Sequence, residues 1–103
     1  NEAVVHLYDP LHPAVLRLIA ITLQAGAKAE LPVSVCGEMA GNPAYTLLLL
    51  GMGLRHFSMH PARILEIKQQ ILRADLNELV PKVQRILKLE DPTRIREAVE
   101  KLA

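Results

Sequence analysis

Cys36 is the residue of this chain whose side chain is best suited to chemistry. It is the sole cysteine among 103 residues, and it stands between an apolar, strand-like run (residues 32–35) and a glycine-punctuated turn that extends to Gly41. A free thiol has a pKa of about 8.5, so it is protonated near neutral pH and can still release its proton. Active sites of parallel α/β proteins gather at the carboxyl ends of the strands. Cys36 is therefore a candidate catalytic residue.

Two other interpretations of this thiol remain open. A lone cysteine in an apolar stretch is most often a small buried hydrophobe. A redox-sensing thiol would instead need to be exposed and rich in thiolate. Among its neighbours, Gly37 and Gly41 would let the backbone approach a substrate closely. Glu38 either orients the thiol or is an ordinary loop carboxylate.

The histidines do not indicate a metal site. None has the i, i+4 or paired-cysteine spacing of a zinc centre, so we assign no metal ligand within the chain. His60 follows the second predicted strand, but it precedes Pro61 and is expected to cap a helix. The four histidines are His6, His12, His56 and His60.

Three helices are expected to begin with a polar residue followed by proline, because proline suits the first helical position. These starts are His12-Pro13, Asn42-Pro43 and His60-Pro61. The first helix is predicted over residues 13–24, with Gly26 as its C-terminal stop. The second is predicted over residues 43–50, ended by a turn at residues 51–53.

Strands are predicted between these helices, over residues 32–36 and 54–59. The resulting β-α-β-α order requires parallel strands with right-handed helical crossovers. Four successive leucines, residues 47–50, leave the second helix no clearly polar face, so we expect it to be buried on most sides. The third helix places three isoleucines on one face: Ile64, Ile67 and Ile71.

The chain after Asp75 is charged and helical in pattern. Asp91-Pro92 predicts a helix start, followed by an apolar stripe. A second stripe precedes it, interrupted by Pro81, near which we expect a helix boundary or a kink. Mixed charges along these segments are typical of a solvated face. The stripes comprise Leu79, Val83, Ile86 and Leu87, and then Ile95, Val99 and Leu102.

Composition narrows the class of protein. Half of the residues are hydrophobic but only one Phe and two Tyr are present, which favours a helix-rich α or α/β domain. The formal net charge of +1 indicates neither a nucleic-acid nor an anionic-membrane partner. No apolar run is long enough to span a bilayer, and one cysteine cannot form an internal disulfide. A reducing cytoplasm is the expected compartment.

Two strands with their helices cannot close a hydrophobic sheet. We expect strand-helix units over residues 1–75 and terminal helices over residues 76–103. This content fits the C-terminal portion, the last two strand-helix units, of a (β/α)8 barrel, a fold of about 250 residues. The chain begins at Asn1 without an initiator Met, which suggests a fragment of a longer protein. Alone, it should expose apolar strand edges or cover them by pairing with another copy.

Several stretches together resemble enzyme I of the phosphoenolpyruvate-dependent sugar phosphotransferase system. The related pyruvate phosphate dikinase and phosphoenolpyruvate synthase share the Cys-Gly core but are less similar around the leucines and Gly-Met-Gly, so that branch is the alternative. Asn42 stands where the family more often has aspartate, and both residues are good N-caps. The resemblance covers Val35-Cys36-Gly37-Glu38-Met39-Ala40-Gly41, residues 47–54 and 57–59, and extends through residues 6–10, 13–16 and 64–76.

The resemblance implies a phosphoenolpyruvate-binding (β/α)8 barrel. In this family phosphoenolpyruvate passes its phosphoryl group to a histidine on a separate domain and then to a phosphocarrier protein, leaving pyruvate enolate. Cys36 aligns with the cysteine that protonates C3 of the enolate, and the amides of residues 37–41 would stabilise the thiolate. Gly37 would approach the substrate.

The resemblance also implies what lies outside the chain. Phosphoryl transfer needs Mg²⁺ and positive charge around the phosphate, and the family's metal ligands, substrate arginines and phosphorylated histidine all lie upstream of Asn1. We therefore expect the isolated piece to be inactive and its parent to be a magnesium-dependent phosphotransferase. The same barrel forms the family's homodimer, so a non-catalytic dimerisation module is the competing hypothesis.

Overall fold

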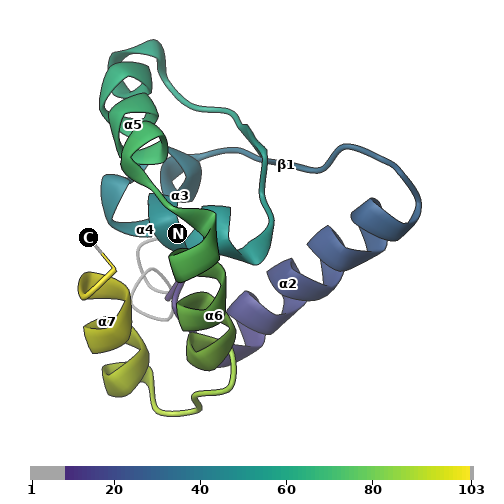
Figure 1. Ribbon diagram of the computed structural model, residues 1–103, viewed down its shortest axis with the longest axis vertical. Helices are drawn as coiled ribbons and strands as arrows, with labels where there is room; N and C mark the ends of the chain where they lie inside the picture. The colour runs from purple at the N-terminus through teal and green to yellow at the C-terminus, as the bar shows by residue number, and fades with distance from the viewer. Residues whose placement is uncertain (1–8, 103) are drawn as a thin grey trace, which may run out of the picture.

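The computed structural model describes residues 9–102, a helix-rich α/β arrangement with one small sheet (Figure 1). His6 and the quoted segment upstream of Asp9 lie outside the described residues. The predicted helix-rich α/β class is confirmed. The elements are α2 (Pro13–Lys28), β1 (Ser34–Val35), α3 (Glu38–Gly41), α4 (Pro43–Met52), β2 (His56–Phe57), α5 (Pro61–Arg73), α6 (Leu76–Ile86) and α7 (Pro92–Glu100).

The two strands pair in parallel, as predicted. Ser34 lies opposite His56 and Val35 opposite Phe57, and the Ser58 N–H donates to the Val35 carbonyl at 2.9 Å. Both strands are shorter than the predicted ranges 32–36 and 54–59. Within the described residues each strand pairs only with the other, so no further strand holds the flanking residues extended.

The predicted helix starts are confirmed by their caps. His12 Nδ1 accepts from the N–H of the second residue of α2 at 3.1 Å, and His60 Nδ1 accepts from that of α5 at 3.2 Å. Asn42 Oδ1 accepts from Ala44 N–H in α4 at 3.0 Å. Asp91 caps α7 in the same way through Thr93 N–H. Each cap satisfies an amide that has no partner inside its own helix.

The predicted end of α2 is wrong. The helix continues through Gly26, which is buried, to Lys28. A Cβ at Gly26 would lie 3.2 Å from the Leu31 carbonyl oxygen. This glycine therefore lets the chain that follows α2 pack closely against the helix. The actual stop is a Schellman motif, in which Leu31 N–H donates to Gly26 and Glu30 N–H to Ala27, with Glu30 at φ 54°.

The predicted turn at residues 51–53 is also wrong in its first two residues. α4 runs through Gly51 and its last residue is Met52. Gly53 is the C-cap, and its φ of 112° is one that glycine adopts at little cost. Gly51 is buried, and a Cβ there would lie 2.9 Å from Val83 Cβ of α6. Gly51 therefore allows α4 and α6 to approach closely.

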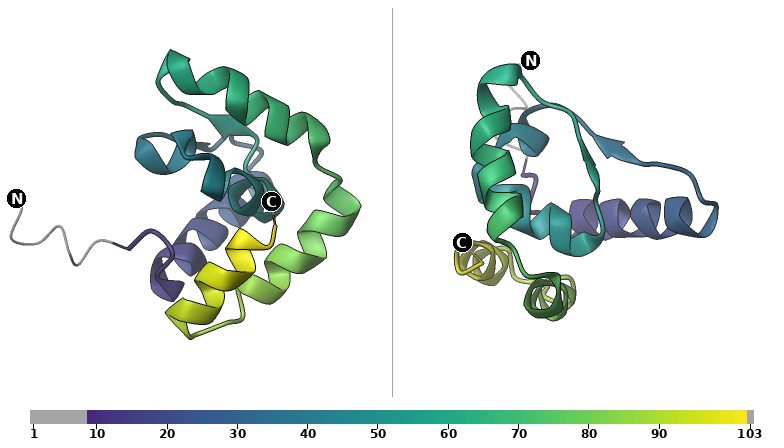
Figure 2. Two further views of the ribbon diagram at one scale, coloured as in Figure 1. Left: turned by 90° about the vertical axis from the view of Figure 1, so that its left-hand side faces the viewer. Right: turned by 45° about the horizontal axis from the view of Figure 1, so that its top comes forward.

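α4 lies at the centre of the helices. Leu48, Leu49 and Leu50 are buried and Leu47 is half-buried, which confirms the expected burial. α5, α6 and α7 all contact α4 and surround it, as the two views of Figure 2 show. The core comprises Leu11, Leu16, Leu23, Leu48, Leu49, Leu50, Met52, Leu54, Leu79, Val83, Ile86, Ile95 and Val99.

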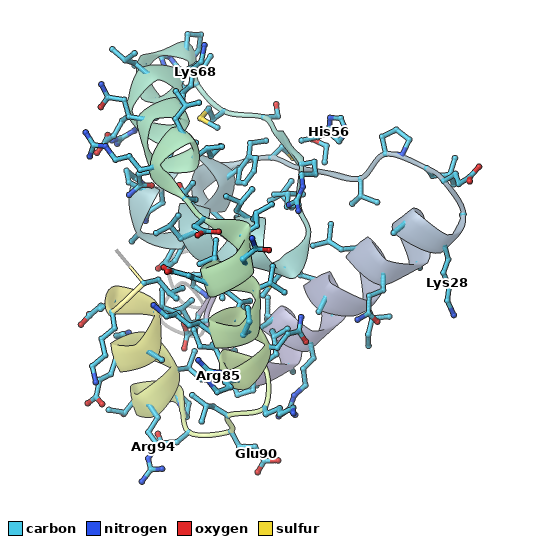
Figure 3. All side chains as sticks on the ribbon, viewed as in Figure 1. Lys28, His56, Lys68, Arg85, Glu90 and Arg94 are labelled. Carbon is cyan, nitrogen blue, oxygen red and sulfur yellow. The ribbon has the colours of Figure 1, made fainter. Side chains whose placement is uncertain are left out.

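α6 is continuous, so the helix boundary expected near Pro81 is absent. Asp75 caps the helix through Asn77 N–H at 2.9 Å, and α6 then includes Pro81 up to Ile86. Proline lacks the N–H that would bond four residues back, and Pro81 is exposed, so water can reach this part of the helix. Charged side chains such as Arg85 and Arg94 project outward, consistent with a solvated face (Figure 3).

The uncovered apolar surface lies on helices rather than on the strands. On α2, Leu18 and Ile21 are 65% and 62% exposed, and on α5, Leu65 and Leu72 are 70% and 75% exposed. Ile64 is also exposed. On the strands, the paired Ser34 and His56 are exposed while Val35 and Phe57 are half-buried. None of the helices in residues 9–102 is long and apolar enough to cross a membrane.

Candidate active site

Cys36 follows β1 directly, and its thiol is free and exposed. It therefore lies at the carboxyl end of a parallel strand, where the sequence placed it. The interpretation of Cys36 as a buried hydrophobe is contradicted by this exposure. An exposed sulfur can meet a ligand, a property that both an acid–base role and a redox role require.

Gly37 turns the backbone immediately after the thiol. Its φ of 84° and ψ of −164° belong to a region that is essentially open only to glycine. No heavy atom lies within 4 Å of a Cβ built at Gly37, so the backbone conformation, rather than lack of space, requires glycine here. Gly37 is also the N-cap of α3. The side chain of Glu38, the other neighbour singled out in the sequence, lies outside the described part.

A cavity of about 730 Å³, here called the rim cavity, opens between the segments that follow the two strands. One wall comes from the residues after β1 and the other from the residues after β2. Cys36 adjoins this cavity through Gly37 but does not itself line it. The lining residues are Gly37, Gly41, Asn42, Pro43, Ser58, Met59, His60 and Arg63. A cavity at the carboxyl edge of parallel strands is where ligands of α/β proteins bind.

Gly41 lies between these two walls. A Cβ at Gly41 would lie 3.4 Å from Met59 Cβ and 3.6 Å from Arg63 Cγ, which are ordinary contact distances. α3 thus lies against the start of α5 at the cavity, and a small side chain at position 41 would fit. Its predicted role, close approach of the backbone to a substrate, stays a prediction.

Ser58 and Arg63 line the cavity but were not predicted as site residues from the sequence. Both stand in the segment after β2, and Arg63 is in the first turn of α5. The signal was present, because the first turn of a helix that follows a parallel strand lies at the same edge as the strand's end. Among the described side chains that line the cavity, Arg63 is the arginine, and none is Asp or Glu.

The described residues do not build a metal site. Among the described side chains, which exclude Glu38, no group of three or more His, Cys, Asp or Glu is arranged to hold a metal ion. Hard cations such as Mg²⁺ take oxygen ligands, usually with one or two carboxylates, and the described lining of the rim cavity offers no carboxylate. These residues therefore do not fit the magnesium ion that the resemblance implies.

The geometry is that of an α/β domain with an exposed thiol at the carboxyl edge of a parallel strand pair, beside a cavity whose described lining includes an arginine. The family model described as "PEP-utilising enzyme, PEP-binding domain", where PEP is phosphoenolpyruvate, matches residues 1–76. The chain belongs to this family.

Known relatives carry the name of the branch that the sequence resembles. A phosphoenolpyruvate-protein phosphotransferase of Cupriavidus necator is 54% identical over 103 residues, which is 100% of this chain and 18% of that protein. One of Listeria monocytogenes is 39% identical over 101 residues, 98% of this chain and 18% of that protein. A Salmonella typhimurium protein named "Phosphoenolpyruvate-dependent phosphotransferase system" is 34% identical over 99 residues, 96% of this chain and 13% of that protein. The chain thus spans less than a fifth of the length of these relatives.

Proposed function

We propose that this chain is the C-terminal part of a phosphoenolpyruvate-protein phosphotransferase. The full-length enzyme transfers the phosphoryl group of phosphoenolpyruvate to one of its own histidines and then to a phosphocarrier protein of the sugar phosphotransferase system, and releases pyruvate. The observation that carries the proposal is the exposed thiol of Cys36 at the carboxyl end of β1 in a chain of the PEP-utilising family.

In this proposal Cys36 is the acid that completes the reaction. When the phosphoryl group leaves, the remaining enolate carries excess electron density at C3. The Sγ–H bond of Cys36 breaks as a C3–H bond forms, which yields pyruvate and a thiolate. In the reverse direction the thiolate removes a C3 proton. Such a role requires a thiol that is accessible to the substrate, and the exposure of Cys36 meets this requirement.

We place β1 and β2 as the last two strands of a (β/α)8 barrel whose other strands belong to the full-length protein. The exposed Leu18 and Ile21 of α2 support this, because an incomplete barrel leaves apolar helix faces uncovered. We place the magnesium ligands outside this chain as well, and no step above passes through the metal. A catalytic free thiol suits the reducing cytoplasm.

The proposal is tested with the purified full-length protein that contains this chain. Phosphoenolpyruvate and a phosphocarrier protein are supplied, and pyruvate is measured with lactate dehydrogenase. We expect the full-length protein to form pyruvate and the 103-residue chain to form none. Absence of pyruvate with the full-length protein would contradict the function. Turnover by the 103-residue chain alone would contradict the placement of the metal and substrate ligands outside it.

A second candidate function is association without catalysis, as a homodimerisation module. The exposed Leu65 and Leu72 on α5 favour it, because exposed apolar residues on a helix are often covered in an assembly. The two functions are compatible. They are separated by Cys36→Ser in the full-length protein, because a purely associative role predicts normal turnover in that variant.

A further inference from the structure

Among the described side chains, which do not include Glu38, the lining of the rim cavity offers hydrogen-bond donors and no carboxylate. Four of its lining side chains are polar or charged: Asn42, Ser58, His60 and Arg63. An arginine always carries positive charge, and a serine hydroxyl can donate. The caps that His60 and Asn42 make to their helices show which of their side-chain atoms are already used as acceptors.

The caps leave donors available on both residues. His60 Nδ1 accepts from Ala62 N–H at 3.2 Å, so the neutral imidazole carries its proton on Nε2, which is then a donor. Asn42 Oδ1 accepts from Ala44 N–H at 3.0 Å, so its amide N–H₂ group is the part left to bind a ligand. Each residue therefore uses its acceptor for its helix and keeps its donor.

Arg63 adds charge to these donors. Its Cγ lies 3.6 Å from the position of a Cβ at Gly41, so the close approach of α3 holds the stem of this arginine at the cavity wall. Among the described side chains, which do not include Glu38, no hydrogen bond or ion pair to the Arg63 guanidinium is found. A guanidinium presents a rigid fork of donors that matches carboxylate and phosphate oxygens.

We propose that the rim cavity binds an oxyanion, the carboxylate or phosphate group of a small molecule, with Arg63 as the charged ligand and His60 and Asn42 as neutral donors. One source of the oxyanion is phosphoenolpyruvate, which carries a carboxylate and a phosphate and would react beside Cys36. For this source the inference rests on the proposed function. The other source is a separate phosphate-bearing anion. Arg63 is thus a substrate-binding residue or part of a second anion site.

The experiment uses the full-length protein and two variants, Arg63→Gln and Arg63→Lys. Arg73→Gln is the matched control, because Arg73 is also exposed on α5 but lies ten residues along the helix, away from the rim cavity. KM for phosphoenolpyruvate, kcat and the inhibition constant of inorganic phosphate are measured. We expect Arg63→Gln to raise KM for phosphoenolpyruvate or the inhibition constant of phosphate at least tenfold, with kcat little changed. Arg63→Lys should recover part of the lost affinity. Arg73→Gln should match wild type in all three constants.

The outcomes separate the two sources. A raised KM assigns the oxyanion to the substrate, whereas a raised phosphate inhibition constant with unchanged KM assigns it to a separate anion. Unchanged values in Arg63→Gln, or equal changes in Arg73→Gln, would overturn the inference while the proposed function stands. If the wild-type protein forms no pyruvate, the proposed function fails. The oxyanion site is then tested by thermal unfolding: inorganic phosphate should raise the melting temperature of wild type but not that of Arg63→Gln.

Discussion

Cys36 and Gly37 act together as a structural unit. The exposed thiol is followed at once by Gly37, whose backbone angles no other residue adopts at low cost. α3 then places Gly41 beside Met59 and Arg63 at the rim cavity. The direction in which the chain leaves the thiol thus depends on the backbone angles of Gly37.

Gly37→Ala tests this dependence. We expect a loss of about 1–3 kcal/mol in the free energy of unfolding, since a Cβ makes these angles costly. We also expect a fall in pyruvate formation, because relief of the strain would reorient Cys36. Urea unfolding and the pyruvate assay measure the two effects. Ser58→Ala, on the opposite wall at ordinary φ, is the stability control, and equal stability of Gly37→Ala and Ser58→Ala would contradict the account.

The candidate site could be predicted from the sequence only in part. The exposed position of Cys36 followed from a strand-like run that ends in a glycine-rich turn. Arg63 was not predicted, although its place in the first turn after the second strand was a usable signal. The contact of α3 with the start of α5 could not be predicted, because it depends on tertiary packing that local patterns do not encode.

At the scale of elements, the helix starts marked by a cap and proline were predictable, whereas the ends of α2 and α4 were not, and neither was α3, which replaces part of the expected turn before Gly41. A start depends on a cap and a proline within two residues, as at His12, Asn42, His60 and Asp91. An end depends on where packing stops favouring the helix. The glycines at 26 and 51 looked like stops, yet both are buried inside helices at close contacts with neighbouring elements.

The end of α2 gives a prediction with a built-in control. Glu30 has a left-handed φ of 54°, so Glu30→Gly should raise the free energy of unfolding by about 0.5–1 kcal/mol. Ala29→Gly, one residue earlier at φ −83° and ψ −1°, should lower it by about 0.5–1 kcal/mol. Urea unfolding compares both variants with wild type. A change of the same sign in both would contradict the assignment of Glu30 as the left-handed residue.

At the scale of the whole molecule, α4 organises the packing. Its leucines supply much of the core, and α5, α6 and α7 pack around it. The sequence predicted this burial because four successive leucines leave no polar face. It did not predict the short strands or the exposed apolar faces of α2 and α5, since those depend on which other elements are present.

The contact between α4 and α6 is tested at Gly51 and Val83. Gly51→Ala favours the helix by about 1 kcal/mol, but the new Cβ collides with Val83 of α6, and overpacking costs about 1–3 kcal/mol. We expect Gly51→Ala to destabilise wild type more than it destabilises the Val83→Ala background, which loses the colliding Cγ atoms but keeps the Cβ 2.9 Å away, as measured by urea unfolding of all four proteins. An equal effect of Gly51→Ala in both backgrounds would show that the helices are not in close contact here.

The central claim is that Cys36 moves a proton to and from C3 of pyruvate enolate. The most direct measurement is exchange of the pyruvate methyl protons with deuterated water, followed by proton NMR in the presence of the full-length protein. Cys36→Ser and Cys36→Ala should slow the catalysed exchange about a hundredfold or more while melting temperatures stay at the wild-type value. Exchange at the wild-type rate in folded Cys36→Ala would contradict the claim.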